Sequence, residues 1–212
     1  EDPVKEWIEA HQKVLDEAKV RFGCVVPMGF DTILFAPDGD SPPDEVVEKW
    51  LEDDYSRLQG LLEKMHGRDE YGVQVFYTPK VFEDAAIRDS EALRKMREEI
   101  ASKSPGIAYM YRQKLEMALK DEVEALVGQY FHEFHERISS HCEEMVVGKI
   151  KKTQKNNKMF LNVYCLVPRD GVDGLGEELE KVQAFEGITV RFTGPWPPYS
   201  FVADLSGSSR NG

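Results

Sequence analysis

The sequence predicts an α+β protein built from two unlike halves. Segments with helical spacing of apolar side chains alternate with short strand-like runs, and the longest periodic segment lies in the second half. Charge divides the chain in the same way, because residues 1–100 sum to −11 whereas residues 101–212 sum to −1. We therefore expect an α+β domain at 1–78, a second α+β domain with long helices and a small antiparallel sheet at 79–205, and a flexible tail at 206–212.

Composition excludes several classes of function. The 212 residues carry a net charge of −12, and 41% of them are hydrophobic, which is enough to bury a core. Such an acidic surface repels phosphate backbones and anionic lipid heads, so we expect neither a nucleic-acid nor a membrane partner. No apolar stretch approaches the ~18 residues that a membrane span needs, and the first residues do not resemble a signal peptide. Three separated cysteines without a C-x-x-C pair favour reduced thiols in the cytoplasm.

In the first half, a helix is expected from Pro3 to about Arg21, with Asp2 as its N-cap. Two strand pieces follow within 24–35, and they are interrupted at Gly29. The remaining elements are one amphipathic helix over 44–65, ended by His66-Gly67, and an alternating strand over 70–77. A split βαβ sheet needs a strand before the first helix, and we expect that strand to be missing from this sequence.

In the second half, a crossing segment leads to helices and then to a small set of strands. Ser90 is expected to cap the first helix, and the longest periodic segment is either one helix or two helices broken near Gly128. The expected elements are a crossing segment over 79–89, helices over 91–101, 111–138 and 175–185, strands over 146–150, 159–167 and 187–192, and a polar hairpin loop over 151–157.

One short stretch resembles a metal site. His132, His135 and Glu136 are spaced three and four residues apart, which places them on one helical face. The order is not H-E-x-x-H, and a third protein ligand would require His141 or Cys142 to turn back toward the pair. A metal-dependent enzyme is therefore an alternative hypothesis, and a solvated helix face is the simpler interpretation.

Other catalytic patterns are missing from the sequence. It contains no G-x-S-x-G elbow, no dinucleotide-binding glycine motif and no P-loop. Acidic pairs such as Asp53-Asp54 and Glu143-Glu144 are typical of solvated helix faces. We therefore predict no enzymatic activity and no cofactor.

Five lysines lie within ten residues, with no acidic side chain between them. They are Lys149, Lys151, Lys152, Lys155 and Lys158. A basic hairpin of this kind either docks onto an acidic partner or protects a sheet edge from pairing with other strands.

The segment Thr193–Val202 is unlike an ordinary loop. Three prolines in four positions remove three backbone donors, so the segment is expected to be extended and cannot form a helix or a central strand. Trp196, Tyr199 and Phe201 either attach the segment to its own domain or serve as anchors for a partner.

This segment resembles the C-terminal signature of the gas vesicle protein F/L family (GvpF/GvpL), which ends in a Gly-Pro-Trp-Pro-Pro-Tyr-x-Phe run. Four further stretches resemble family patterns in the same order along the chain, namely 25–33, 70–75, 106–110 and 159–167. Gly29 and Asp31 depart from the pattern, where the family usually has Arg and Gly. The resemblance extends from about Val14 to Val202.

The resemblance implies a fold and a role. It implies that the first domain is a modified ferredoxin-like unit without its first strand. It also implies an accessory or minor structural protein that binds the hydrophobic shell protein GvpA, together with other accessory proteins, during gas vesicle assembly in the cytoplasm. We expect Trp196, Tyr199 and Phe201 to contribute to binding. A structural component lodged in the finished vesicle wall is the alternative within the same family.

Overall fold

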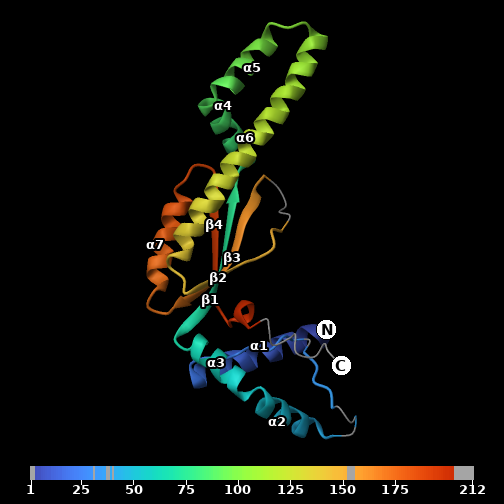
Figure 1. The fold of residues 1–212 in the computed structure, drawn as a ribbon, viewed down its shortest axis with the longest axis vertical. Coiled ribbons are helices and arrows are strands. Elements are labelled where there is room, and N and C mark those ends of the chain that lie inside the picture. Colours follow the sequence, from blue (N-terminus) through green and yellow to red (C-terminus); the bar gives the residue numbers. More distant parts are fainter. Residues whose placement is uncertain (1–2, 31, 37–38, 40, 152–155, 203–212) are drawn as a thin grey trace.

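The chain forms an elongated molecule with three parts (Figure 1). The computed structural model describes residues 3–30, 32–36, 39, 41–151 and 156–202. Its helices are α1 (Pro3–Phe22), α2 (Pro43–Asp53), α3 (Tyr55–Met65), α4 (Pro79–Asp89), α5 (Glu91–Ala101), α6 (Pro105–Ser139), α7 (Val172–Gln183) and the 3-10 turn η1 (Tyr199–Phe201). Its strands are β1 (Arg68–Tyr77), β2 (Glu144–Val147), β3 (Lys158–Pro168) and β4 (Ile188–Trp196).

An antiparallel sheet occupies the middle of the molecule, with strand order β2-β3-β1-β4. The central strand β1 pairs on both sides, so that Val73 lies opposite Val163 of β3 and Phe192 of β4. One end of the molecule is a helical arm, formed by α4, α5 and the first half of α6 (Figure 1). The other end is the N-terminal lobe, formed by α1, α2, α3 and the chain between α1 and α2.

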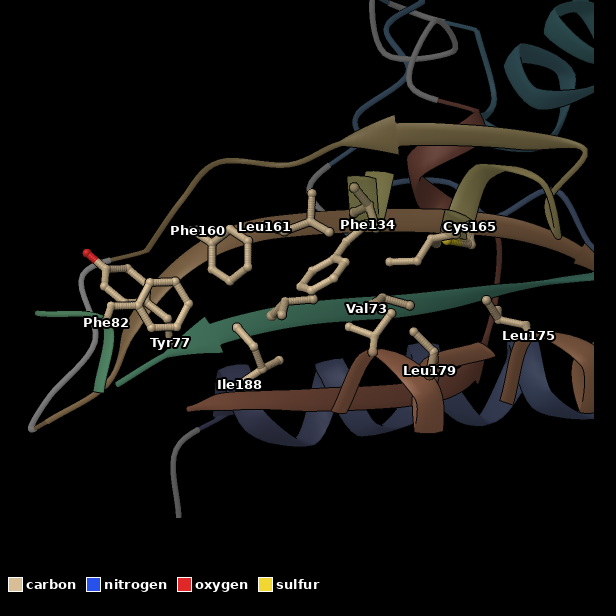
Figure 2. Close-up of a cluster of buried hydrophobic side chains, with 14 of the residues drawn as sticks. Val73, Tyr77, Phe82, Phe134, Phe160, Leu161, Cys165, Leu175, Leu179 and Ile188 are labelled. Atoms are coloured by element: carbon tan, nitrogen blue, oxygen red, sulfur yellow. The ribbon is translucent and has the colours of Figure 1, made fainter. Parts of the chain in front are cut away.

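The main core lies on one face of the sheet, under α6 and α7 (Figure 2). Alternate residues of β1 and β3 point into it, including Val73, Val75, Leu161 and Val163, as the period of two in a strand requires. Phe134 of α6 is fully buried there. Its ring centroid lies 5.1 Å from that of Phe185 and 5.2 Å from that of Tyr130.

The opposite face carries a smaller junction cluster. Its buried members are Met65, Leu166, Phe201 and Val202. Partly buried side chains from the chain after α1, from α3 and from β2 and β3 complete it: Cys24, Val26, Met28, Leu58, Leu61, Val146 and Tyr164. This cluster attaches the N-terminal lobe to the sheet.

The expected α+β class is confirmed, and the sheet joins both sequence halves. β1 comes from the expected 1–78 unit, whereas its partners β3 and β4 come from the expected 79–205 unit. The division after residue 78 stays a prediction, and the sheet extends across it. The expected tail at 206–212 lies outside the described residues.

Two helical expectations need correction, and one open alternative is decided. Residues 44–65 form α2 and α3 instead of one helix, with a break at Asp54, a poor helix former whose carboxylate pairs with Arg57. The expected crossing segment at 79–89 is α4, which begins with Pro79 at a favourable position and buries Phe82. The segment around Gly128 is continuous, because α6 is a single helix of 35 residues. The cap at Ser90 is confirmed, since its hydroxyl accepts from the Leu93 amide at 3.4 Å.

The strand pieces expected within 24–35 are wrong. The described residues of that stretch form no strand, and Pro27 lacks the amide that a ladder would use. Cys24, Val26 and Met28 nevertheless alternate toward the junction cluster. The alternation therefore comes from an extended chain packed on one side, and it does not indicate a paired strand.

Candidate partner-binding site at the C-terminal aromatic segment

The aromatic segment begins as the end of an edge strand and continues as a tight turn. β4 extends to Trp196, four residues beyond the end expected from the sequence, and it pairs on one side only, with β1. An edge position tolerates Pro195, which has no amide to donate. Tyr199 to Phe201 then form η1. The segment is thus neither a central strand nor an α-helix, but it is not extended throughout.

Gly194 lets the segment approach β1 closely. Its φ is +132°, and a Cβ atom at this position would lie 2.9 Å from the Glu70 carbonyl oxygen and 2.8 Å from the Tyr71 ring. The register of β1 against β4 is also irregular here, because it shifts between Glu70 and Gly72 of β1. Only glycine fits this backbone and this space without displacement. The peptide bond between Gly194 and Pro195 is cis.

Glu70 holds the turn against the sheet. Its buried carboxylate accepts two hydrogen bonds at 2.8 Å, one from the Ser200 amide and one from the Ser200 hydroxyl. Burial raises the pKa of the Glu70 carboxyl, and the two hydrogen bonds from Ser200 oppose that rise. This contact fixes the position of η1, and with it the neighbouring aromatic side chains.

The three aromatic residues predicted for binding lie in different environments. Phe201 is 7% exposed and packs in the junction cluster, where the Lys64 ammonium lies 5.9 Å from its ring centroid. Trp196 is 49% exposed, and its Nε1–H donates to the Thr193 hydroxyl at 3.3 Å. Tyr199 is 36% exposed, and its hydroxyl shares a 3.2 Å hydrogen bond with His11 Nε2 of α1. Phe201 attaches the segment to the protein, whereas Trp196 and Tyr199 keep part of their rings exposed.

An ion-pair hub supports the site from the side of the N-terminal lobe. The buried carboxylate of Asp69 lies 2.9 Å from Lys19 Nζ of α1 and 3.3 Å from Arg169 Nε after β3. Arg169 also donates to the Gly23 carbonyl at 2.6 Å. These contacts hold the end of α1 next to β1. His11, which bonds Tyr199, lies on the same helix.

Sequence reasoning did not find Glu70, Ser200 or Asp69. The sequence pattern places Glu70 in a strand and Ser200 in the aromatic segment, and it indicates no contact between them. A carboxylate that follows Arg68 and Asp69 at the start of β1 is a weak local signal. Its partner lies 130 residues away, so the pairing itself leaves no local trace.

The residues of the metal hypothesis do not form a site in the described part of the chain. The rings of His132 and His135 both lie against Phe131, with centroids 5.5 Å and 5.9 Å from it. Across the ranges that the structure describes, no three His, Cys, Asp or Glu side chains gather as metal ligands. The structure therefore offers no support for an enzyme that uses His132, His135 and Glu136.

Other charged stretches have structural partners or lie partly outside the described residues. Glu143 pairs with Arg68 at 2.6 Å, and Glu144 pairs with Lys64. Lys152 and Lys155 of the basic hairpin fall outside the described residues. Within the described ranges, no helix is both long enough and apolar enough to cross a bilayer.

The chain is similar to known gas vesicle proteins over nearly its whole length. The family described as "Gas vesicle synthesis protein GvpL/GvpF" matches residues 1–203. Gas vesicle protein L1 of Halobacterium salinarum is 26% identical over 215 residues, which cover 96% of this chain and 73% of that protein. Gas vesicle protein F of a Streptomyces species is 31% identical over 205 residues, which cover 94% of this chain and 79% of that protein.

A solved structure shares the fold. The crystal structure of GvpF from Anabaena superposes with a TM-score of 0.70 at 18% identity, covering 92% of this chain and 76% of that one. GvpF from Microcystis aeruginosa gives a TM-score of 0.61 at 17% identity, with 92% and 77% coverage. At these identities the likeness establishes the arrangement of helices and strands.

Proposed function

Since the chain belongs to the GvpL/GvpF family of gas vesicle synthesis proteins, we propose that it binds the hydrophobic shell protein GvpA and takes part in assembling the vesicle. In this role it works by binding rather than by catalysis. It acts with other gas vesicle accessory proteins, in the cytoplasm and at the growing vesicle.

The half-exposed Trp196 ring is the observation that carries the binding proposal. Large aromatic side chains are enriched among the residues that dominate protein interfaces. Trp196 and Tyr199 stand on a backbone fixed by the Glu70–Ser200 contact and by the close approach at Gly194. A rigid base reduces the conformational entropy that binding would otherwise cost. The two rings are therefore suited to hold an apolar partner surface.

Charge supports the same role. Residues 1–100 carry a net charge of −11, and the acidic side chains of α1 and α2 are exposed on the N-terminal lobe beside the aromatic segment. A strongly charged surface opposes aggregation. Bound to an apolar subunit, the lobe would keep the complex in solution until the subunit is added to the shell.

Co-expression with GvpA tests this function. We expect the wild-type chain to keep GvpA in the soluble fraction and to be recovered with it on an affinity tag. A Trp196→Ala, Tyr199→Ala variant should recover at most about one tenth as much GvpA, since hot-spot truncations cost at least ~2 kcal/mol. Tyr55→Ala removes an exposed ring from α3 and serves as the matched control.

The result that would overturn the site is equal recovery of GvpA by the double variant and by the wild type. Recovery of no GvpA by the wild type would overturn the binding function itself. Phe201 is left unchanged in this experiment, because its burial means that truncation would disturb the fold.

Immunodetection on washed vesicles separates an assembly factor from a wall component. If the chain acts only during assembly, the washed vesicles should lack it, while the cytoplasm retains it. Retention on the washed vesicles at a fixed ratio to GvpA would instead indicate a component of the wall.

A further inference from the structure

The N-terminal lobe contains a groove lined by both apolar and charged side chains. It lies between α2 and the chain at Leu34 and Phe35, encloses about 740 Å³ and includes Val46 and Trp50 among its lining residues. No residue of α2 is buried, and the Phe35 ring is 76% exposed. An amphipathic helix of 11 residues is marginal in water without a packing partner. The groove therefore has the character of one half of an interface.

Carboxylates line the same groove. Glu45, Glu48, Glu52 and Asp53 all contribute to it, against a single basic residue, Lys49. Within the described part of the chain, none of these four carboxylates has a Lys, Arg or His nitrogen within 4 Å, although ion pairs are common elsewhere on the surface. Apolar side chains beside these carboxylates fit a basic amphipathic helix.

The first half of α6 has the complementary surface. Met110 and Met117 are 61% and 60% exposed, and Ile107 is half-exposed. Their spacing of three and seven residues places them on one face of the helix, with Lys114 on the same face. The other face of α6, which includes Ala108, packs within the arm. Unbranched Met side chains adapt readily to a partner surface.

This stretch is basic in an otherwise acidic protein. Residues 103–120 contain four basic side chains, Lys103, Arg112, Lys114 and Lys120, and one acidic side chain, Glu116. Within the described ranges, no carboxylate lies within 4 Å of the Lys103, Arg112 or Lys114 side-chain nitrogens. Lys103 and Lys114 lie near the ring of Tyr111, at 5.3 and 5.8 Å from its centroid. Their charge is available to an acidic partner.

We propose that the groove beside α2 receives the Ile107–Met117 face of α6 from a second copy of this chain. The apolar side chains of this face contact Phe35 and Trp50 of the groove, and Lys103 and Lys114 meet the carboxylates of α2. The two surfaces lie at opposite ends of the molecule (Figure 1). The contact is therefore head-to-tail, and each added copy leaves one groove and one helix face free for the next.

Sedimentation equilibrium of the purified chain tests this contact. The weight-average mass of the wild type should rise above 24.2 kDa with concentration and should not level off at two copies. Measurements up to about 1 mM detect contacts of about 4 kcal/mol. A groove variant, Glu48→Lys with Glu52→Lys, and a face variant, Met110→Ser with Met117→Ser, should each remain monomeric when alone.

Mixing the two variants provides the decisive outcome. The groove variant keeps an intact helix face and the face variant keeps an intact groove, so an equimolar mixture should form 1:1 dimers and nothing larger. Glu177→Lys with Glu180→Lys makes the same charge change on exposed positions of α7 and should associate like the wild type. Each variant must retain the wild-type circular dichroism spectrum, and exposed positions are chosen for that reason.

Three results would overturn the proposal. The wild type could remain at 24.2 kDa across the whole concentration range. The groove and face variants could associate as strongly as the wild type. Their mixture could remain monomeric although the wild type associates.

Discussion

The main core and the junction cluster lie on opposite faces of one sheet, and they hold their helices by different means. The main core unites the sheet with α6 and α7 through a large set of buried side chains. The junction cluster has four buried members, and the lobe beside it also depends on the Asp69 hub and on the ion pair of Lys64 with Glu144. Apolar burial contains no charge to titrate or to be screened, whereas partly exposed ion pairs weaken as their groups titrate and as salt screens them.

The difference suggests that the two parts of the molecule differ in stability. The sheet and its helices form a stable scaffold, and the N-terminal lobe is expected to open at lower free energy, because few apolar contacts hold it. The exposed aromatic rings and the α2 groove both lie at or beyond the junction. The groove proposed for a second copy thus belongs to the less strongly attached lobe, whereas the α6 face proposed to fill it belongs to the helical arm.

The largest expected loss of stability comes from a substitution in the main core. Phe134→Ala removes a fully buried ring between Tyr130 and Phe185, and it should lower the free energy of unfolding by about 3–5 kcal/mol. Urea denaturation followed by circular dichroism measures this change. Phe22→Ala, which removes an exposed ring from α1, should change stability by less than about 0.5 kcal/mol. Equal losses for the two variants would contradict the placement of the core.

A second substitution tests the close approach of the aromatic segment. Gly194→Ala places a methyl group against Glu70 and Tyr71 at a positive φ, so we expect a loss of about 2–3 kcal/mol. Gly60→Ala in α3 has open space around it and should be neutral or slightly stabilising, since alanine favours a helix. Thermal unfolding measures both variants. Unchanged stability of Gly194→Ala would contradict the prediction and would mean that β4 leaves the sheet before residue 194.

A third substitution addresses the junction. Asp69→Ala leaves Lys19 and Arg169 without their carboxylate, and we expect a loss of about 1–2 kcal/mol because both cations keep access to solvent. Hydrogen exchange should accelerate in α1 but not in α6. Asp84→Ala breaks an exposed pair with Lys80 in the arm and should leave α1 unchanged. Uniform acceleration throughout the chain would mean that the lobe and the sheet open together.

The smallest expected effect is a difference between Glu70 and Glu178 in how their contributions to stability depend on pH. Burial raises the pKa of Glu70 at the junction above 4.5, so its contribution to stability is present in acid and is lost as pH rises through the raised pKa. The hydrogen bond from Arg137 lowers the pKa of Glu178 on α7 below 4.5, so its contribution is present above pH 4.5 and is lost as pH falls through the lowered pKa.

Stability curves between pH 3 and pH 7 for two variants would show the opposite signs. Glu70→Gln should gain stability relative to the wild type as pH rises above 4.5. Glu178→Gln should be less stable than the wild type near neutrality and should approach it in acid. Parallel curves for the two variants would contradict the assigned environments.

Local patterns predicted most helices and the two long strands of the sheet. α1, α5 and α7 were expected within a few residues of their bounds, because apolar spacing is a local signal, as is the Ser90 cap of α5. The pairing of β1 with β3 and β4 was not predicted, since partners about 90 to 120 residues apart leave no local trace. Strands were wrongly expected within 24–35, because one-sided packing of an extended chain produces the same alternation of apolar residues as a paired strand.

The candidate site was predicted in part. The proline and aromatic content of Thr193–Val202 singled out the segment, but composition could not tell which ring is buried. Only the contacts of Phe201 with Met65 and Leu166 separate it from the exposed Trp196. The acidic groove and the basic face of α6 were not predicted, because both depend on how distant segments are placed in space.

A site-specific photocrosslinker tests the central claim, that the C-terminal aromatic segment contacts the shell protein. The crosslinker would replace Trp196 in one variant and Tyr55 in another, in cells that make gas vesicles, since both rings are exposed but lie on different elements. We expect a covalent adduct with GvpA from position 196 and none from position 55. An adduct from position 55 alone, or none from either position while vesicles still form, would contradict the claim.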